Sequence, residues 1–305
     1  MKIVYDNQTS GFDRPVAIAL GNFDGVHLGH SYLIKKMQAK AHQQELSSAV
    51  CIFSPHPQHY YKRFIPLLNT REQKFKLLEE TGTDFLFQVA FNEAFAQMQP
   101  EAFIENYLIK RLQVKAVIVG DDFRFGYGRR GNTKLLIDYC TGKGLVCESI
   151  DRIRINNEIV SSSRIREKIL EGRLDEVPPL LGRNYSCIGT VVRGDGIGHK
   201  LGFPTANLAV ESELIPQEGV YLGYLVFRAV RYKAMIYIGK RPTVISSGER
   251  RFEVFILDFP DIDIYNESLE VFFSKQIRQS KRFESMEELK SQLTEDKAVT
   301  QNYDY

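Results

Sequence analysis

The apolar positions of the first half of the chain form short, nearly continuous runs that alternate with stretches of helical spacing. Four such runs lie at residues 16–20, 48–53, 84–89 and 115–119. Runs of this length and apolarity predict strands that are buried on both faces. Helical spacing between them, as in residues 100–112, predicts βαβ units. The first half is therefore expected to be an α/β domain built on a parallel sheet.

The pattern changes after a pair of prolines at residues 178–179. From Tyr185 onward, β-rich runs are separated by turn residues, and helical spacing returns only after Ser285, where Glu288 completes a capping box. This pattern is typical of a closed antiparallel barrel with one C-terminal helix. We expect a first domain over residues 1–182 and a second over 183–305. The predicted barrel strands and final helix lie at residues 187–192, 219–226, 234–238, 252–257, 269–273 and 286–293.

Length and composition set broad limits on function. A chain of 305 residues suits two domains, and a net charge of +2 argues against nucleic acid or an anionic membrane as a dominant partner. The first residues show no signal-peptide pattern, and no apolar run approaches the length of a membrane span. The four cysteines are scattered without metal-ligand spacing, which is typical of reduced thiols in a cytoplasmic protein. We expect small-molecule substrates and a monomer or weak oligomer.

The corner after the first apolar run has the most distinctive chemistry. It reads Gly-Asn-Phe-Asp-Gly-Val-His-Leu-Gly-His over residues 21–30 and leads into a predicted helix. Helix N-termini favour phosphate, and His27 and His30 can stabilise a phosphorus centre that gains negative charge. The segment is neither a Walker loop nor a dinucleotide-binding fingerprint. The alternative interpretation is an ordinary strand-to-helix corner with one capping histidine.

Three later segments are expected to join this corner. His56 follows the second strand, and Asp122 and Phe123 follow the fourth, at positions where α/β sheets collect ligands. The serines at 161–163 and Arg164 open a helix and offer hydroxyl, N–H and guanidinium groups to phosphate. The alternatives are a solvated loop histidine, an ordinary glycine-rich turn and an unremarkable capped helix.

Taken in order, these motifs resemble those of nucleotidyltransferases with the HxGH signature, and the first corner is most similar to that of FAD synthetases. The resemblance extends to Gly-x-Asp-Phe-x-Phe-Gly at 120–126 and to the serine-rich helix start. It implies a Rossmann-like domain that transfers AMP from ATP to FMN, giving FAD and pyrophosphate. His27 and His30 would stabilise the developing charge and Arg164 would steady phosphates. The other implied site residues are Gly21, Asn22, Phe23, Asp24, Gly29, His56, Asp122, Phe123, Ser161, Ser162 and Ser163.

The barrel half contains Gly-Phe-Pro-Thr-Ala-Asn at residues 202–207, preceded by further glycines. Backbone N–H groups of such a segment can wrap phosphates, and Thr205 and Asn207 offer oxygens suited to Mg²⁺. A flexible hairpin is the alternative. The hexapeptide resembles that of riboflavin kinases, which implies phosphorylation of riboflavin to FMN by ATP with Mg²⁺ at Thr205 and Asn207. The implied phosphate-site residues are Gly194, Gly198, Lys200, Gly202, Thr205 and Asn207.

The resemblance also implies a base for the kinase reaction. Glu253 lies in the run after Arg-Pro-Thr at residues 241–243, where riboflavin kinases place the glutamate that accepts the proton of the flavin hydroxyl. An exposed strand glutamate is the competing interpretation. Four nearby positions depart from the kinase pattern, which has arginine, asparagine, histidine and glycine there. They are His199, Tyr237, Phe255 and Asn266.

Three rival functions are also compatible with the sequence. The first is an FAD synthetase whose barrel only binds flavin. The second, from another class, is a flavin- or nucleotide-sensing binding protein on an enzyme scaffold. The third is adenylylation of a different phosphate acceptor. The intact histidine corner, the Thr205–Asn207 pair and Glu253 favour a bifunctional enzyme over these rivals.

Overall fold

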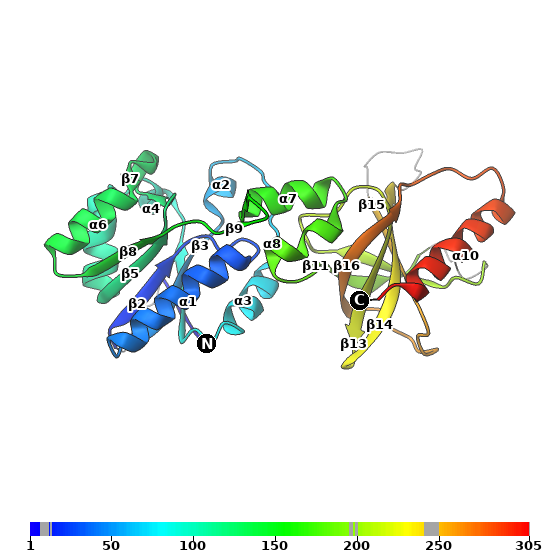
Figure 1. Ribbon diagram of the computed structural model, residues 1–305, viewed down its shortest axis with the longest axis horizontal. Helices are drawn as coiled ribbons and strands as arrows, with labels where there is room; N and C mark the ends of the chain where they lie inside the picture. Colours follow the sequence, from blue (N-terminus) through cyan, green and yellow to red (C-terminus); the bar gives the residue numbers. More distant parts are fainter. Residues whose placement is uncertain (7–11, 13, 195–197, 199–200, 241–249, 305) are drawn as a thin grey trace. The chain divides into compact units, whose positions relative to one another are not determined.

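The computed structural model describes residues 1–6, 12, 14–194, 198, 201–240 and 250–304 (Figure 1). The chain divides into two compact units. One comprises Met1–Pro66 and Arg71–Ser161, and the other comprises Leu67–Thr70 and Ser162–Tyr305. The main division between the units falls after Ser161, earlier in the chain than the expected domain boundary at 182/183. That boundary stays a prediction. No helix among the described residues is long and apolar enough to cross a membrane.

The first unit is built on a six-stranded sheet in the order β1-β4-β3-β2-β5-β8, and every neighbouring pair is parallel. This confirms the predicted α/β sheet. The chain moves from β2 to one side through β3 and β4, and then crosses to β5 on the other side of β2. A crevice opens at the carboxyl ends of the strands at such a reversal. The strands are β1 (Lys2–Tyr5), β2 (Val16–Leu20), β3 (Ser47–Ser54), β4 (Phe85–Ala90), β5 (Val114–Gly120) and β8 (Val146–Ile150).

Both faces of this sheet are covered, which explains the continuous apolar runs. Ile18 and Leu20 enter the core on one face, while Ala17 and Ala19 enter the core on the other. The first core also receives a π-helix and α6, and the second receives α1 and α3. The covering helices are α1 (Leu28–Gln43), α3 (Arg71–Glu79), the π-helix Phe103–Arg111 and α6 (Thr133–Gly142). Short elements complete the unit: α2 (Pro57–Tyr60), α4 (Glu93–Ala96), α5 (Pro100–Ala102), β6 (Arg124–Phe125), the 3₁₀ turn Tyr127–Arg129, β7 (Gly131–Asn132), β9 (Arg154–Ile155) and β10 (Glu158–Ile159).

The π-helix replaces most of the α-helix that helical spacing predicts over residues 100–112. It buries Phe103, Ile104 and Leu108. Its later part is fastened to the end of β1, because the Tyr107 hydroxyl donates to the Asp6 carboxylate at 2.7 Å and the Arg111 guanidinium lies 2.8 Å from the same carboxylate. Burial and this hydrogen bond raise the pKa of Tyr107, so its hydroxyl remains a donor.

The second unit is a closed antiparallel barrel in the order β11-β12-β15-β14-β13-β16, with a C-terminal helix, as predicted. The sequence pattern missed the strand β12, and the last helix is longer than predicted. The elements are α7 (Ser162–Leu170), a 3₁₀ turn at Leu174–Glu176, α8 (Pro178–Leu181), β11 (Tyr185–Val192), β12 (Thr205–Val210), β13 (Gly219–Phe227), β14 (Val230–Lys240), β15 (Arg250–Ile256), β16 (Ser268–Arg278) and α10 (Met286–Asn302).

Polar contacts hold α10 against the barrel. The Ser285 hydroxyl accepts the Glu288 N–H at 3.1 Å, which caps the first turn as predicted. Asp296 is 1% exposed and pairs with the Arg278 guanidinium of β16 at 2.8 Å. At the other end, the Lys233 ammonium of β14 donates to the carbonyl of Gln301 at 2.6 Å. The middle and the C-terminal end of α10 are thus fixed to strands of the barrel.

Candidate active sites

His27 and His30 meet at the start of α1, directly after the sheet reversal at β2. His27 is the N-cap, and its Nδ1 accepts the backbone N–H of His30 at 3.3 Å. Because an accepting ring nitrogen carries no proton, the neutral His27 ring carries its proton on Nε2. The two rings stack with centroids 3.6 Å apart. The capping role and a phosphate-binding role therefore use different nitrogens of the same ring.

The loop that leads to His27 is strained and closely packed. Phe23 and Val26 have φ values of 49° and 41°, in the left-handed region that side chains rarely adopt, and Gly25 has a φ of 88°. Phe23 is fully buried, with its ring centroid 5.1 Å from that of His30, and Asp24 is 3% exposed. The surrounding packing thus holds a backbone conformation that the isolated loop would avoid.

Two of the predicted glycines lie where a side chain would disturb this corner. A Cβ on Gly29 would lie 3.1 Å from Cε1 and Nδ1 of His27, and a Cβ on Gly21 would lie 3.1 Å from the Phe23 ring. The same Cβ position on Gly29 lies 3.7 Å from the carbonyl oxygen of Val160. The segment just before Ser161 therefore passes beside the histidine corner.

The other predicted loops lie at the same edge of the sheet. His56 follows β3, caps α2 by accepting the Gln58 N–H at 3.2 Å, and is 9% exposed, so it is not a solvated loop histidine. Asp122 and Phe123 follow β5. The Arg152 guanidinium lies 3.8 Å from the Asp122 carboxylate. Since β3, β2 and β5 are adjacent parallel strands, their carboxyl ends bring these loops together.

Sequence reasoning missed a group of aromatic side chains at the carboxyl ends of β3 and β4. Phe91 makes edge-to-face contacts with Phe53, Tyr60 and Phe95, with ring centroids 5.3–6.2 Å apart. Tyr61 also contacts Phe91 and is 52% exposed. These aromatic residues lie in separate segments between residues 53 and 95. The sequence shows that each segment is hydrophobic but not that the segments meet. Their rings offer apolar surface to a planar ligand.

The serine-rich helix start belongs to the second compact unit. Ser162, Ser163 and Arg164 form the first turn of α7, and the Arg164 guanidinium pairs with Glu167 at 2.7 Å. Ser161 is the last residue of the first unit. The expected contact of Ser162, Ser163 and Arg164 with phosphate at the histidine corner stays a prediction.

The predicted kinase residues share one face of the barrel. Asn207 of β12 pairs directly with Glu253 of β15, and Thr205 pairs with Phe255. Because alternate residues of a strand point to the same face, Thr205, Asn207 and Glu253 lie on one side. The Glu253 side chain is 21% exposed and its Oε1 lies 3.4 Å from the Arg251 guanidinium. Glu253 is therefore not a freely exposed strand glutamate.

The predicted phosphate-loop glycines lie against these oxygens. A Cβ on Gly198 would lie 3.1 Å from the Thr205 hydroxyl, and a Cβ on Gly194 would overlap the Asn207 amide. The Phe203 N–H donates to the Gly198 carbonyl at 2.8 Å. Gly202 adopts a φ of 82° beside open space. Lys200, His199 and residues 241–243 lie outside the described residues.

Three of the four departures from the kinase pattern lie among the described residues. Phe255 packs in an apolar cluster with Phe203, Met235 and Leu257, and Tyr237 lies against the same cluster. The rings of Phe255 and Phe203 are 5.3 Å apart. These substitutions thus place apolar surface beside Glu253, and Phe203 comes from the motif itself. Asn266 has a φ of 65°, which asparagine tolerates better than most residues.

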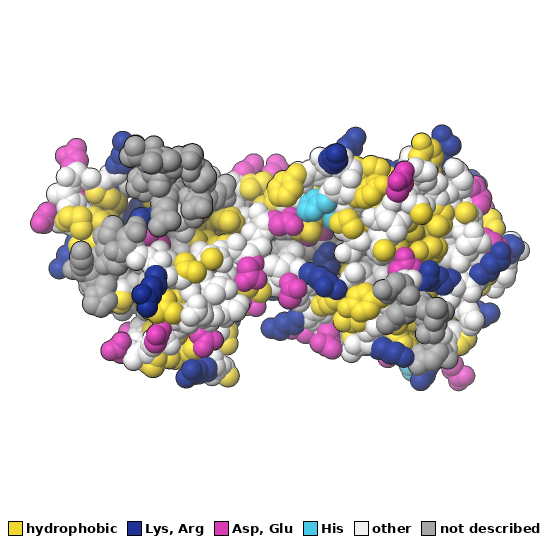
Figure 2. Space-filling model, turned by 180° about the vertical axis from the view of Figure 1, so that it is seen from behind, with side chains coloured by type: hydrophobic (Ala, Val, Ile, Leu, Met, Phe, Trp, Pro, Cys, Tyr) yellow, Lys and Arg dark blue, Asp and Glu magenta, His cyan; other side chains and the backbone are white. Residues whose placement is uncertain are grey.

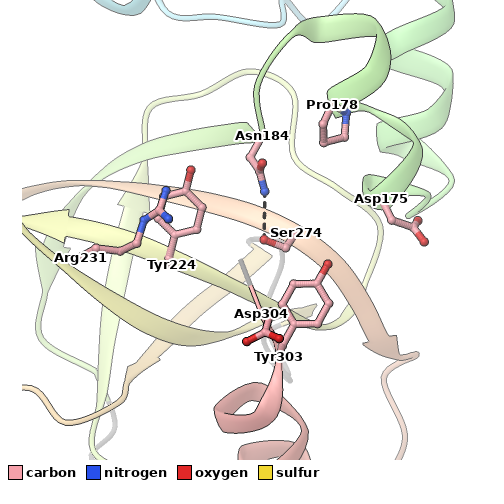
Figure 3. Close-up of a pocket in the computed structure, with 8 residues that line it drawn as sticks. All are labelled: Asp175, Pro178, Asn184, Tyr224, Arg231, Ser274, Tyr303 and Asp304. Carbon is pink, nitrogen blue, oxygen red and sulfur yellow. Dashed lines mark hydrogen bonds between the residues drawn. The ribbon is translucent and has the colours of Figure 1, made fainter.

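A separate hollow of about 240 Å³ lies elsewhere on the second unit (Figure 3). The Arg231 guanidinium stacks 3.9 Å from the ring centre of Tyr224, and the Asn184 amide donates to the Ser274 hydroxyl at 2.9 Å. Tyr224 and Ser274 belong to β13 and β16, which lie opposite β12 and β15 in the barrel order. This hollow is therefore distinct from the predicted kinase site. Its lining residues are Asp175, Pro178, Asn184, Tyr224, Arg231, Ser274, Tyr303 and Asp304.

Charged side chains of both signs are mixed on one face of the molecule (Figure 2). On the face shown in Figure 2, basic and acidic side chains are interspersed among apolar and neutral ones. A nucleic-acid surface gathers lysine and arginine in a stripe or patch. The mixed pattern on this face agrees with the net charge of +2.

Comparison with known proteins assigns both halves. The FAD synthetase family matches residues 10–164, and the riboflavin kinase family matches residues 181–303. Bifunctional riboflavin kinase/FMN adenylyltransferases are similar over most of their length. The Escherichia coli K12 protein is 34% identical, covering 94% of this chain and 92% of that protein, and the Listeria monocytogenes protein is 36% identical, covering 94% and 91%.

A solved structure shares the complete fold. A Streptococcus pneumoniae protein described as a macrolide-efflux protein has a TM-score of 0.91 and 29% identity, with 100% of both chains covered. The two family matches and the full-length relatives agree with the order of motifs and with the two architectures described above. The chain belongs to the bifunctional riboflavin kinase/FMN adenylyltransferase family, whose two activities convert riboflavin to FMN and FMN to FAD.

Proposed function

We propose that the histidine corner at residues 21–30 carries the FMN adenylyltransferase activity and that the face formed by β12 and β15 carries the riboflavin kinase activity. The observation that best supports the first assignment is the His27 cap, because it directs the ring proton to Nε2 at a helix N-terminus. The second assignment is supported by the direct pairing of Asn207 with Glu253.

In the adenylyl transfer, a phosphate oxygen of FMN attacks the α-phosphorus of ATP. The bond from the α-phosphorus to the bridging oxygen breaks, and pyrophosphate leaves, so no covalent enzyme intermediate is needed. His27 and His30 donate hydrogen bonds to the α-phosphate as its charge grows, and the N–H groups and dipole of α1 add to this stabilisation. Asn22 and Asp24 shape the corner, and Arg164 steadies phosphates.

The flavin ring needs a planar, apolar surface beside this corner. The aromatic side chains of Phe53, Tyr60, Tyr61 and Phe91 provide one at the carboxyl ends of β3 and β4. Phe123 and Phe125 stack at 5.6 Å after β5. Tyr60 and Tyr61 follow β3, and Phe123 and Phe125 follow β5, the two neighbours of β2, so we assign the isoalloxazine ring to this edge of the sheet.

In the kinase reaction, the 5′-hydroxyl oxygen of riboflavin attacks the γ-phosphorus of ATP. Its proton passes to the Glu253 carboxylate, and ADP leaves. The Arg251 guanidinium, 3.4 Å from Glu253, helps to keep the carboxylate oriented. The backbone N–H groups of Gly194 and Gly198 are assigned to phosphate oxygens. The apolar cluster around Phe255 shields the reaction from water on one side.

The oxygens of Thr205 and Asn207 fit Mg²⁺. Both are neutral, they lie on one face, and glycines leave space directly against them. Among the described side chains, no group of three or more histidines, cysteines and carboxylates could hold a metal ion, so a site here would take only part of its ligands from the protein. Mg²⁺ bound in this way keeps waters and substrate phosphates as further ligands and neutralises phosphate charge. The cytoplasmic location and the monomeric or weakly oligomeric state stay predictions.

Separate product assays test the two assignments. Purified protein with ATP and Mg²⁺ receives either riboflavin or FMN, and FMN and FAD are quantified by chromatography. We expect His30→Ala to lower FAD formation from FMN by at least about 100-fold while riboflavin is still phosphorylated. Glu253→Gln should lower phosphorylation of riboflavin by about 100-fold or more while FMN is still converted to FAD.

The same assays separate the rival functions. A kinase-inactive barrel would give FAD from FMN but no product from riboflavin, and a sensing protein would give neither product. Unchanged FAD formation in His30→Ala would show that the histidine corner is not the adenylyl-transfer site.

A further inference from the structure

Lys74 is a buried cation that contacts the histidine corner and has no role in the two proposed reactions. It lies in α3, which covers the same face of the sheet as α1, as Figure 1 shows. Its side chain is 9% exposed, and its Nζ donates to the backbone carbonyl of Asn22 at 3.2 Å. A buried ammonium is costly unless it is paired and hydrogen-bonded, so this position favours contact with the corner over solvation.

The contact falls at the beginning of the strained loop. Asn22 directly precedes Phe23, whose φ is 49°, and His27 caps α1 five residues later. Left-handed backbone at non-glycine residues persists only when neighbouring contacts impose it. The hydrogen bond from Lys74 is one such contact, and it acts on the backbone rather than on a replaceable side chain. Its positive charge also lies next to the corner that is proposed to receive the triphosphate of ATP.

We propose that Lys74 is a positioning residue of the adenylyl-transfer site. By holding the Asn22 carbonyl, its ammonium keeps the 21–27 loop in the conformation that presents His27 and His30 to the α-phosphate of ATP. The proposal rests on the assignment of that corner as the adenylyl-transfer site. It predicts that Lys74 acts on the chemical step rather than on global folding.

The test compares Lys74→Met, which keeps the length of the stem but removes the ammonium, with Lys74→Arg, which keeps a cation and donors. Lys76 is exposed on the same helix, so Lys76→Met is a matched control. We expect Lys74→Met to lower kcat for FMN adenylylation by about 10- to 100-fold, the effect of losing one charge-assisted hydrogen bond. The KM for FMN should change much less, because the flavin surface is not involved.

Riboflavin phosphorylation by the same protein is the internal control for the barrel unit, and an unchanged circular dichroism spectrum is the control for folding of the unit that contains Lys74. Riboflavin phosphorylation should stay within about twofold of the parent in Lys74→Met, and Lys74→Arg should recover part of the adenylylation rate. Unchanged adenylylation in Lys74→Met, with His30→Ala inactive, would overturn the role of Lys74 but leave the site assignment intact. If Lys74→Met lost both activities, Lys74→Arg would decide. Parental kinase activity with partial adenylylation in Lys74→Arg would support the proposal. A fall of both activities together in Lys74→Arg would overturn it.

Discussion

At the residue scale, the histidine corner depends on the absence of a side chain at Gly29. A Cβ there would lie 3.1 Å from two ring atoms of His27, closer than the ring can accept without moving. We expect Gly29→Ala to displace His27 and lower kcat/KM for FMN adenylylation by about 10- to 100-fold, since small misplacements of a catalytic group have effects of this size. Riboflavin phosphorylation by the same protein should not change.

A matched glycine controls for the substitution itself. Gly142, the last residue of α6, has no neighbouring heavy atom within 4 Å of its Cβ position. Gly142→Ala should leave both activities at the parental level. Equal rates for Gly29→Ala and Gly142→Ala in the adenylylation assay would contradict the packing of His27 against Gly29.

Cys187 gives a prediction about alkaline pH. Burial raises the pKa of its thiol from 9.0 to about 12, and the Sγ donates to the Leu214 carbonyl at 3.5 Å. The unfolded thiol ionises near pH 9, whereas the folded thiol stays neutral. The contribution of Cys187 to the free energy of unfolding is thus complete below pH 9 and is lost as the pH rises toward 12, by about 1.4 kcal/mol per unit.

Thermal unfolding followed by circular dichroism measures this effect. We expect the midpoint temperature to fall between pH 9 and 11 and to fall less steeply in Cys187→Ala. Parallel pH dependence in the two proteins would argue against a raised thiol pKa. Iodoacetamide should modify Cys187 at pH 8 only after urea unfolds the barrel, because little thiolate is present in the folded state.

The sequence could predict which residues form the corner but not how they support one another. Histidine spacing and glycines indicated His27 and His30, whereas the capping geometry depends on the loop conformation at Phe23 and Val26. Lys74 was missed because its helix lies about 50 residues after the corner in the sequence and carries no motif. The pairing of Asn207 with Glu253 depends on strand register, which a motif alone does not define.

At the element scale, periodicity predicted the buried strands well because both faces of the parallel sheet are covered. It failed where polar residues begin a strand, as in β12, whose first residues Thr205 and Asn207 are predicted to serve the kinase site. It also could not separate an α-helix from the π-helix Phe103–Arg111, since the two place apolar residues at similar spacing over nine residues. The contacts of Tyr107 and Arg111 with Asp6 are long-range and invisible to a local pattern.

The docking of α10 provides a prediction at this scale. Asp296 is 1% exposed and accepts from the Arg278 guanidinium and from the Gln292 amide. Asp296→Ala would leave the largely buried guanidinium without this carboxylate, at a cost of about 3 kcal/mol in the free energy of unfolding. Urea denaturation of the whole chain measures this loss. The neighbouring Glu295 is exposed, and Glu295→Ala should cost less than about 0.5 kcal/mol. Similar midpoints for the two variants would show that the buried pair does not hold α10.

At the scale of the whole molecule, each compact unit has its own core and its own predicted site. In the proposed assignment, FMN is the product of the barrel site and the nucleophile at the histidine corner. Two variants, each lacking one activity, can therefore test whether FMN travels through solution.

We expect a mixture of His30→Ala and Glu253→Gln proteins to form FAD from riboflavin, ATP and Mg²⁺. The first protein makes FMN, and the second adenylylates it. FAD should appear after a lag, because free FMN must first accumulate toward the KM of the second protein. A chromatographic time course of riboflavin, FMN and FAD measures the lag, and each variant alone should give no FAD from riboflavin. If the mixture gave no FAD while the Glu253→Gln protein still converted added FMN, the His30→Ala protein would be retaining its FMN. Transfer between sites would then have to occur within one chain.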